Sequence, residues 1–289
     1  MNSRKFTIPE RIEKLGILYI IGTPIGNMED ITIRQLRMLK EVDFICAEDT
    51  RVTLKLLNRY EIKKELVSFH EHSSNADAQR IIDRILSGEN AGIVTDAGMP
   101  CISDPGEVLV KLCYENNIDV KVVPGAAAVT SAAALSGLDI KRFTFEGFLP
   151  VQKKERVERL EILRNETAIM IFYEAPHKLK NTLADLNGFF GGNRKIVLCR
   201  ELTKIHEQVI RMDLKEAVEY YEKNEPKGEF VLVLEGKTQT ENDKPTIEQA
   251  MEQVRKLIDM GEKPTDACKA VARETGYKKS ELYSALQNA

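Results

Sequence analysis

Short apolar runs alternate with amphipathic segments from residue 17 to about residue 137. The runs have the length of strands, and the segments at residues 31–42 and 78–87 repeat their apolar positions with helical spacing. Such alternation is typical of βαβ units on a mostly parallel sheet. The expected strands are residues 17–21, 43–47, 66–69, 91–95 and 120–123. The pattern therefore predicts an α/β domain over residues 15–140.

A second α/β domain is predicted over residues 141–236, after Pro124-Gly125 and an alanine-rich helix at residues 126–136. Its expected helices are residues 153–164, 176–186 and 214–222. Its expected strands are residues 168–173, 196–199 and 229–234. The two halves together predict an α/β protein built from two α/β domains.

A polar stretch at residues 236–245 has the composition of a linker. The three helical patterns that follow it are residues 246–260, 265–275 and 279–286. Short helices separated by glycine turns resemble a small helix-turn-helix bundle. The sequence therefore predicts a C-terminal helical module over residues 245–289.

Two Gly/Pro-punctuated loops, residues 22–27 and 95–100, each follow an apolar run. At the carboxyl ends of parallel strands, such loops expose backbone N–H and C=O groups to a ligand. We interpret the pair as the site of a nucleoside-like cofactor. A dinucleotide fold would need G-x-G-x-x-G at the first loop, and Pro24 interrupts that pattern, so NAD is disfavoured.

Length and composition indicate the number of domains and the class of protein. A length of 289 residues with 43% apolar content suits about two domains. No apolar run approaches the ~20 residues of a membrane span, and residues 1–10 lack the apolar centre of a signal peptide. The five cysteines form no C-x-x-C pair, so we expect neither disulfides nor a thiolate zinc site. We expect a cytoplasmic protein without a metal.

Charge gives only a local indication of a partner. The net charge of −3 shows no general attraction to nucleic acid. Residues 150–215, however, hold 13 Lys or Arg against 9 Asp or Glu. This excess is compatible with a surface that faces a polyanion, or simply with solvated helix faces. The candidate phosphate contacts are Arg51, Lys153, Lys154, Arg156, Arg159, Arg200 and Lys204.

Nine ordered motifs resemble those of the ribosomal RNA small subunit methyltransferase I family, within the tetrapyrrole methylase superfamily of S-adenosyl-L-methionine enzymes. The motifs are Thr23-Pro24-Ile25-Gly26-Asn27, Ala47-Glu48-Asp49-Thr50-Arg51, Asp96-Ala97-Gly98-Met99-Pro100, Ser103-Asp104-Pro105-Gly106, Pro124-Gly125, Glu146-Gly147-Phe148-Leu149-Pro150, Phe172-Tyr173-Glu174-Ala175-Pro176-His177, Arg200-Glu201-Leu202-Thr203-Lys204 and Lys227-Gly228-Glu229. The resemblance runs from about residue 17 through the C-terminal helices.

The resemblance implies two α/β domains with the methyl donor, S-adenosyl-L-methionine, in the cleft between them, in a homodimer. It implies methylation of the ribose 2′-oxygen of a cytidine in the decoding region of 16S rRNA, within the small ribosomal subunit. The donor contacts implied by the superfamily are Pro24, Asp96, Ala97, Gly98, Cys101, Ala127, Ala128, Tyr173 and Leu202. The small residues among them would let a flat adenosine approach the backbone closely.

The run Glu48-Asp49-Thr50-Arg51 follows an apolar strand and opens a helix, so it is expected to face the cleft. Glu48 and Asp49 are candidate bases for a weakly acidic ribose hydroxyl, and Arg51 is a candidate phosphate clamp. Capping of the helix by Asp49 or Thr50 is the structural alternative, and it is compatible with function. His70 is a further candidate base or RNA contact. Asp104-Pro105 is interpreted as the N-cap and first residue of a helix.

Two other functions stay open. The chain could methylate a small tetrapyrrole with the same fold and donor, although Ala47-Glu48-Asp49-Thr50-Arg51 and Phe172-Tyr173-Glu174-Ala175-Pro176-His177 favour the ribosomal branch. It could instead be a ribosome-binding assembly factor that holds the donor without turnover. Labelled donor offered with small subunits or with a uroporphyrinogen-type acceptor would distinguish them.

Overall fold

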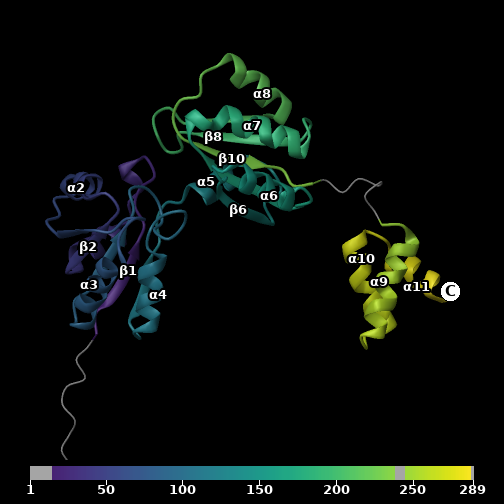
Figure 1. Ribbon diagram of the computed structural model, residues 1–289, viewed down its shortest axis with the longest axis horizontal. Helices are drawn as coiled ribbons and strands as arrows, with labels where there is room; N and C mark the ends of the chain where they lie inside the picture. Colours follow the sequence, from purple (N-terminus) through teal and green to yellow (C-terminus); the bar gives the residue numbers. More distant parts are fainter. Residues whose placement is uncertain (1–14, 238–244, 288–289) are drawn as a thin grey trace, which may run out of the picture. The chain divides into compact units, whose positions relative to one another are not determined.

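The computed structural model describes residues 15–237 and 245–287. Contacts divide the chain into two units, Met1–Gly236 and Lys237–Ala289. Two five-stranded sheets lie in the first unit, coloured purple to green in Figure 1, and three helices form the second. The predicted α/β class with C-terminal helices is confirmed.

The first sheet is entirely parallel, with the strand order β3-β2-β4-β1-β5. Its strands are β1 (Ile17–Ile21), β2 (Phe44–Ala47), β3 (Glu65–Ser68), β4 (Ala91–Val94) and β5 (Asp119–Val123). All five agree with the expected apolar runs to within one residue at each end. Every residue of β2 and β4 is buried, as expected for parallel strands covered on both faces.

Four helices cover this sheet, two on each face. The side of Ile21 and Ile45 packs against α1 (Ile33–Glu41) and α2 (Thr50–Arg59). The opposite side, with Leu18 and Phe44, packs against α3 (Asn75–Leu86) and α4 (Glu107–Glu115). A short 3-10 turn, η1 (Met28–Asp30), precedes α1.

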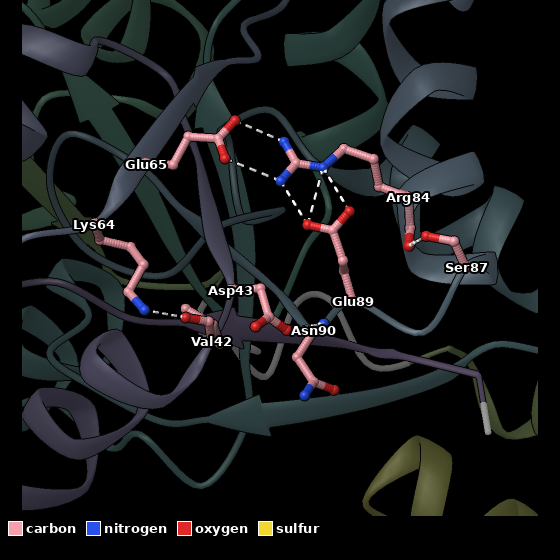
Figure 2. Close-up of polar contacts among 8 residues, drawn as sticks. All are labelled: Val42, Asp43, Lys64, Glu65, Arg84, Ser87, Glu89 and Asn90. Atoms are coloured by element: carbon pink, nitrogen blue, oxygen red, sulfur yellow. Dashed lines mark hydrogen bonds and ion pairs between the residues drawn. The ribbon is translucent and has the colours of Figure 1, made fainter.

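Hydrogen bonds and ion pairs connect the segments at which the strands of this sheet begin (Figure 2). The Arg84 guanidinium donates to Glu65 at 2.7 and 3.0 Å and to Glu89 at distances down to 2.6 Å. It also lies 3.7 Å from the centre of the Phe44 ring. The backbone N–H of Asn90 donates to the Asp43 carboxylate at 2.7 Å. These contacts lie at the edge where β2, β3 and β4 begin, and the loops after β1 and β4 leave the sheet at the opposite, carboxyl edge.

The second sheet is mixed, with the order β6-β7-β10-β8-β9. Its strands are β6 (Phe143–Phe148), β7 (Ile169–Glu174), β8 (Lys195–Arg200), β9 (Gln208–Asp213) and β10 (Phe230–Leu234). Only β6 and β7 pair in parallel; β10 runs antiparallel to β7 and β8, and β9 runs antiparallel to β8. The edge strands β6 and β9 were not expected from the sequence, because their polar residues interrupt the apolar runs.

Alternating residues of β10 face the two sides of this sheet. Leu232 packs with α6 (Lys153–Leu163), α7 (Pro176–Phe190) and α8 (Leu214–Lys223). Val231 and Val233 pack against α5 (Ala128–Ser136), which follows β5 in the chain. The alanines of α5 let this helix lie close to the second sheet, so it joins the two halves of the first unit.

The second unit consists of α9 (Ile247–Asp259), α10 (Pro264–Thr275) and α11 (Lys279–Gln287), in agreement with the expected three helices. Its own buried core includes Val254, Val271 and Leu282. Gly276 ends α10 in the left-handed conformation, at φ 73°. In the two described stretches of the chain, no helix is long and apolar enough to cross a membrane.

Candidate functional site

The loops after β1 and β4 meet at the point where the strand order of the first sheet reverses. The chain leaves β1 toward β2 on one side and leaves β4 toward β5 on the other. Thr23 and Gly98 form an isolated antiparallel bridge between the loops, with N–H···O distances of 2.8 and 3.2 Å. The buried Thr23 hydroxyl donates to the Thr95 carbonyl at 3.1 Å. Crevices at such switch points are where open α/β sheets bind ligands.

Glycine makes the close packing at this edge possible. A Cβ on Gly22 would lie 2.9 Å from the backbone nitrogen of Gly125 in the loop after β5. The Gln35 side chain donates to the Gly22 carbonyl at 2.6 Å. The loops after β1, β4 and β5 are therefore fixed to one another before any ligand binds.

A cavity of about 480 Å³ opens beside these loops, within the usual size range of ligand sites. The first half of the unit contributes lining residues from the loops after β1, β4 and β5. The second half contributes the ends of β6, β7 and β8 and the start of β10. The lining residues are Ile25, Ala97, Gly98, Met99, Ile102, Ser103, Asp104, Ala127, Ala128, Phe148, Tyr173, Glu174, Ala175, Pro176, His177, Cys199, Leu202, Glu229, Phe230 and Val231.

The structure brings together six of the nine residues that the resemblance implied as donor contacts. These six line the cavity: Ala97, Gly98, Ala127, Ala128, Tyr173 and Leu202. The other three lie outside its lining. Pro24 is buried in the loop after β1, and Cys101 borders a separate apolar hollow with Ile20 and Val110. Asp96 directs a carboxylate oxygen to the backbone N–H of Asp49, at 3.1 Å.

The four residues proposed as catalytic also lie outside the lining of the cavity. Glu48 accepts hydrogen bonds from the Thr95 hydroxyl, at 2.5 Å, and from the Asp96 N–H, at 3.3 Å. Asp49 is the N-cap of α2, and its carboxylate accepts from the Arg51 N–H at 2.8 Å. Glu48 and Asp49 therefore link the loop after β2 to the loop after β4.

Arg51 and His70 are exposed to solvent. The Arg51 side chain is 87% exposed and donates to Asp49 at 2.6 Å, which lowers the pKa of Asp49 to about 2. His70 follows β3, and its backbone N–H donates to the Ser73 hydroxyl at 2.9 Å. Of the two, Arg51 presents a cation that a phosphate could approach.

Tyr173 stands at the end of β7 with its ring enclosed by other aromatic side chains. The Phe145 and Phe148 rings contact it edge to face, at centre distances of 4.9 and 5.7 Å. Its hydroxyl accepts a hydrogen bond from the Val129 N–H in the first turn of α5. Burial raises the pKa of Tyr173, so its hydroxyl stays protonated at neutral pH.

The expectation that Asp104 and Pro105 begin a helix was wrong. Helix α4 begins at Glu107, and Gly106 occupies the N-cap position with φ 133°. The chain instead makes a tight loop in which Cys101 and Ser103 have positive φ values of 69° and 62°. That loop turns Asp104 into the lining of the cavity. Burial, with the negative charges of Glu48 and Asp96, raises the pKa of Asp104 to about 6, against the lowering effect of Thr95.

The arrangement has counterparts among known proteins. The chain matches the tetrapyrrole (corrin/porphyrin) methylase family over residues 17–218. It belongs to this family. Ribosomal RNA small subunit methyltransferase I of Thermotoga maritima is 48% identical, over 77% of this chain and 100% of that protein. The protein of the same name from Halalkalibacterium halodurans is 43% identical, over 93% of this chain and 94% of its own length.

Solved structures support the fold of this methylase. Uroporphyrin-III C-methyl transferase from Thermus thermophilus, complexed with S-adenyl homocysteine, superimposes with a TM-score of 0.55. It is 16% identical and covers 76% of this chain and 97% of its own. Diphthine synthase superimposes with a TM-score of 0.62 at 16% identity, over 78% of this chain and 92% of its own.

Charged groups around the methylase cavity are of one sign. Its lining in the described residues includes the carboxylates of Asp104, Glu174 and Glu229 and the His177 imidazole, but no lysine or arginine. Glu174 is buried, and its carboxylate accepts from the Thr182 hydroxyl and, at 2.8 Å, from the Ala175 N–H. All four residues lie in motifs that carry the family resemblance, but none was among the predicted site residues.

Proposed function

We propose that this methylase uses S-adenosyl-L-methionine to methylate the ribose 2′-oxygen of a cytidine in the decoding region of 16S rRNA. The two relatives described above carry the name of a ribosomal RNA small subunit methyltransferase, which supports ribosomal RNA as the substrate. The motifs Ala47-Glu48-Asp49-Thr50-Arg51 and Phe172-Tyr173-Glu174-Ala175-Pro176-His177 favour the ribosomal branch, and the ribose 2′-oxygen and the cytidine are what that resemblance implies.

The observation that carries the proposal is the cavity shared by the two halves of the first unit. Ala97, Gly98, Ala127 and Ala128 give it flat walls with little side-chain bulk, which suits an adenosine. Its charged lining residues are carboxylates, which suit a ligand that carries a sulfonium and an ammonium group. These residues therefore fit the donor in both shape and charge.

The bound donor would supply an electrophilic methyl group. The protein has to hold the ribose oxygen in line with that group and remove the hydroxyl proton. Orientation of two reactants is worth about 7–11 kcal/mol in favourable intramolecular cases. A positioned base typically adds 10²–10⁴-fold. A fixed cavity wall and an available carboxylate at the cavity are thus the two features that the reaction needs.

Exposed lysine and arginine side chains of the first unit are the candidates for contacts with RNA phosphates. Arg51 and Lys154 have side chains 87% and 89% exposed. Arg156 is 14% exposed and bound to Asp185 and Thr182, while Arg159 pairs with the buried Glu146. We therefore propose Arg51, Lys153 and Lys154 as phosphate contacts and exclude Arg156 and Arg159. Residence in the cytoplasm and a homodimer are further parts of this proposal.

Calorimetry with S-adenosylhomocysteine tests the donor site, with NAD as the control ligand. We expect one S-adenosylhomocysteine per chain and no heat from NAD. Labelled S-adenosyl-L-methionine is then offered with small ribosomal subunits from a strain that lacks the enzyme, or with a uroporphyrinogen-type acceptor. Label in the RNA supports the proposal. Label on the tetrapyrrole alone, or donor binding without turnover on any subunit, contradicts it.

A further inference from the structure

We propose that Asp104 accepts the proton of the ribose hydroxyl during methyl transfer, an inference that rests on the proposed function. Asp104 lies in the loop that connects β4 to α4, and it lines the cavity. Asp104 was not among the catalytic residues predicted from the sequence.

The backbone holds Asp104 firmly in this position. Non-glycine residues rarely adopt positive φ, and Cys101 and Ser103 both do so on the approach to Asp104. Such strain is retained where the surrounding structure fixes it, and it concentrates at functional sites. The Cys101 N–H donates to the Pro105 carbonyl at 3.3 Å, which closes the loop around Asp104.

The loop that carries Asp104 also lies close to the second sheet. The Ser103 hydroxyl oxygen would lie 3.1 Å from a Cβ on Gly147, a residue of β6 with φ 61°. The pairing of β6 with β7 shifts register between Phe145 and Gly147, so the strand carries an irregularity at the point of contact. The residue next to Asp104 in the chain therefore lies close to the second half of the unit that forms the cavity.

The charges around Asp104 make its carboxylate a usable base near neutral pH. The negative charges of Glu48 and Asp96, in the loops after β2 and β4, raise the pKa of Asp104, and a hydrogen bond with the Thr95 side chain lowers it. On the second sheet, the negative charge of Asp104 contributes to the raised pKa of Tyr173. Together with burial, these acidic neighbours raise the pKa of Asp104 to about 6, and a base with a pKa near the working pH is the most effective.

The other carboxylates near the site are engaged elsewhere. Glu174 accepts from Thr182 and from the Ala175 N–H. Glu229 is 79% exposed and pairs with Lys204 at 2.9 Å. Glu48 accepts from Thr95 and Asp96, outside the lining. His177 lies at the start of α7, in the part of the lining contributed by the second half, and is the alternative that the experiment must separate from Asp104.

In the proposed step, the ribose oxygen forms a bond to the methyl carbon while the bond from that carbon to sulfur breaks. The electron pair of the broken bond stays on sulfur, which becomes a neutral thioether. The hydroxyl proton passes to a carboxylate oxygen of Asp104, which becomes neutral. Solvent then takes the proton from the protonated Asp104.

The test compares the wild-type protein with Asp104→Asn, His177→Gln and the control Glu107→Gln, an exposed carboxylate in the first turn of α4. Three quantities are measured: the affinity for S-adenosylhomocysteine, the single-turnover methylation rate on small subunits from pH 5 to 8.5, and the pH titration of ¹³C-carboxyl-labelled aspartate. The aspartate signal is assigned by its loss in Asp104→Asn.

We expect the wild-type rate to fall tenfold per pH unit below about pH 6 and the Asp104 signal to titrate in the same range. Asp104→Asn is expected to bind S-adenosylhomocysteine within threefold of wild type, but to lose at least 100-fold in rate and to lose the acid limb. Glu107→Gln is expected to match wild type, and His177→Gln is expected to keep the acid limb.

Several results would overturn the role of Asp104. They are a carboxyl that titrates below pH 4.5, an Asp104→Asn rate within threefold of wild type, retention of the acid limb by Asp104→Asn, or loss of the acid limb in His177→Gln. A loss of more than tenfold in S-adenosylhomocysteine affinity in Asp104→Asn would make Asp104 a donor ligand and also overturn it. Failure of the wild-type protein to bind S-adenosylhomocysteine contradicts the proposed function instead. The titration of the Asp104 carboxyl needs no bound ligand, so the two failures can be told apart.

Discussion

The hydroxyl of Tyr173 accepts a 3.1 Å hydrogen bond from the backbone N–H of Val129. Tyr173 ends a strand of the second sheet, and Val129 lies in the first turn of α5. The N-cap residue of that helix, Ala127, has no side-chain oxygen to satisfy the free N–H groups. A tyrosine that lines the cavity therefore replaces the usual cap of the helix whose first turn also lines it.

Tyr173→Phe is expected to lower the free energy of unfolding by about 1 kcal/mol, because it leaves a helix N–H without its partner. The loosened first turn of α5 should also weaken S-adenosylhomocysteine binding several-fold. Urea denaturation and calorimetry measure the two effects. An unchanged stability together with unchanged affinity would show that this hydrogen bond does not hold the cavity wall.

Ala128→Leu is expected to weaken S-adenosylhomocysteine binding at least tenfold, because it places three additional carbon atoms in the cavity. The matched control is Ala134→Leu, on an exposed position of the same helix, since alanine and leucine have similar helix propensities. Calorimetry on both variants decides the matter. Equal affinities in the two variants would place the donor elsewhere.

Asp104→Asn is expected to stabilise the protein at pH 8. The folded pKa of Asp104 is about 6, above the ordinary value of 3.8, so ionisation of this carboxyl opposes folding. The cost is absent below about pH 4, grows as the pH rises toward 6 and is fully present above that. After allowance for partial solvent access, we expect a gain of about 1–2 kcal/mol. Urea denaturation at pH 4 and pH 8 measures it, and an equal difference at both would contradict the raised pKa.

Arg84→Lys is expected to destabilise the protein by about 1–2 kcal/mol while leaving S-adenosylhomocysteine binding unchanged. A lysine cannot hold Glu65 and Glu89 through several N–H groups while stacking on the Phe44 ring. Arg80→Lys, on the same helix with a side chain 76% exposed, should stay within about 0.5 kcal/mol of wild type. If Arg84→Lys changed donor affinity as well, the two edges of the first sheet would be coupled.

Strands β2 and β4 of the first sheet could be predicted from the sequence because burial on both faces makes them continuous apolar runs. The edge strand β9 (Gln208–Asp213) could not, since its polar residues alternate with apolar ones over only six positions. The parallel or antiparallel direction of the strands in the second sheet was also beyond the sequence pattern, which contains no information on pairing.

Within the site, the loop at residues 95–100 was recognisable from its glycine and proline, whereas Ala127 and Ala128 were implied only by the family resemblance. Asp104 was interpreted through its neighbour Pro105, a local signal for a helix start. The positive φ values of Cys101 and Ser103, which replace that helix start by a tight loop, leave no trace in the residue types. The direction of the Asp96 carboxylate, toward the Asp49 N–H, likewise depends on the neighbouring loop.

The central claim is that the cavity serves methyl transfer to one ribose oxygen of ribosomal RNA. Its most direct test is nucleotide mapping of 16S rRNA, by mass spectrometry of nuclease fragments, after unmethylated small subunits react with the purified protein and S-adenosyl-L-methionine. The account predicts a single new methyl group, on the 2′-oxygen of one cytidine in the decoding region, and a reduced yield of it with Ala128→Leu at limiting donor concentration. A methyl group on a base, at scattered positions, or absent from the RNA altogether would contradict it.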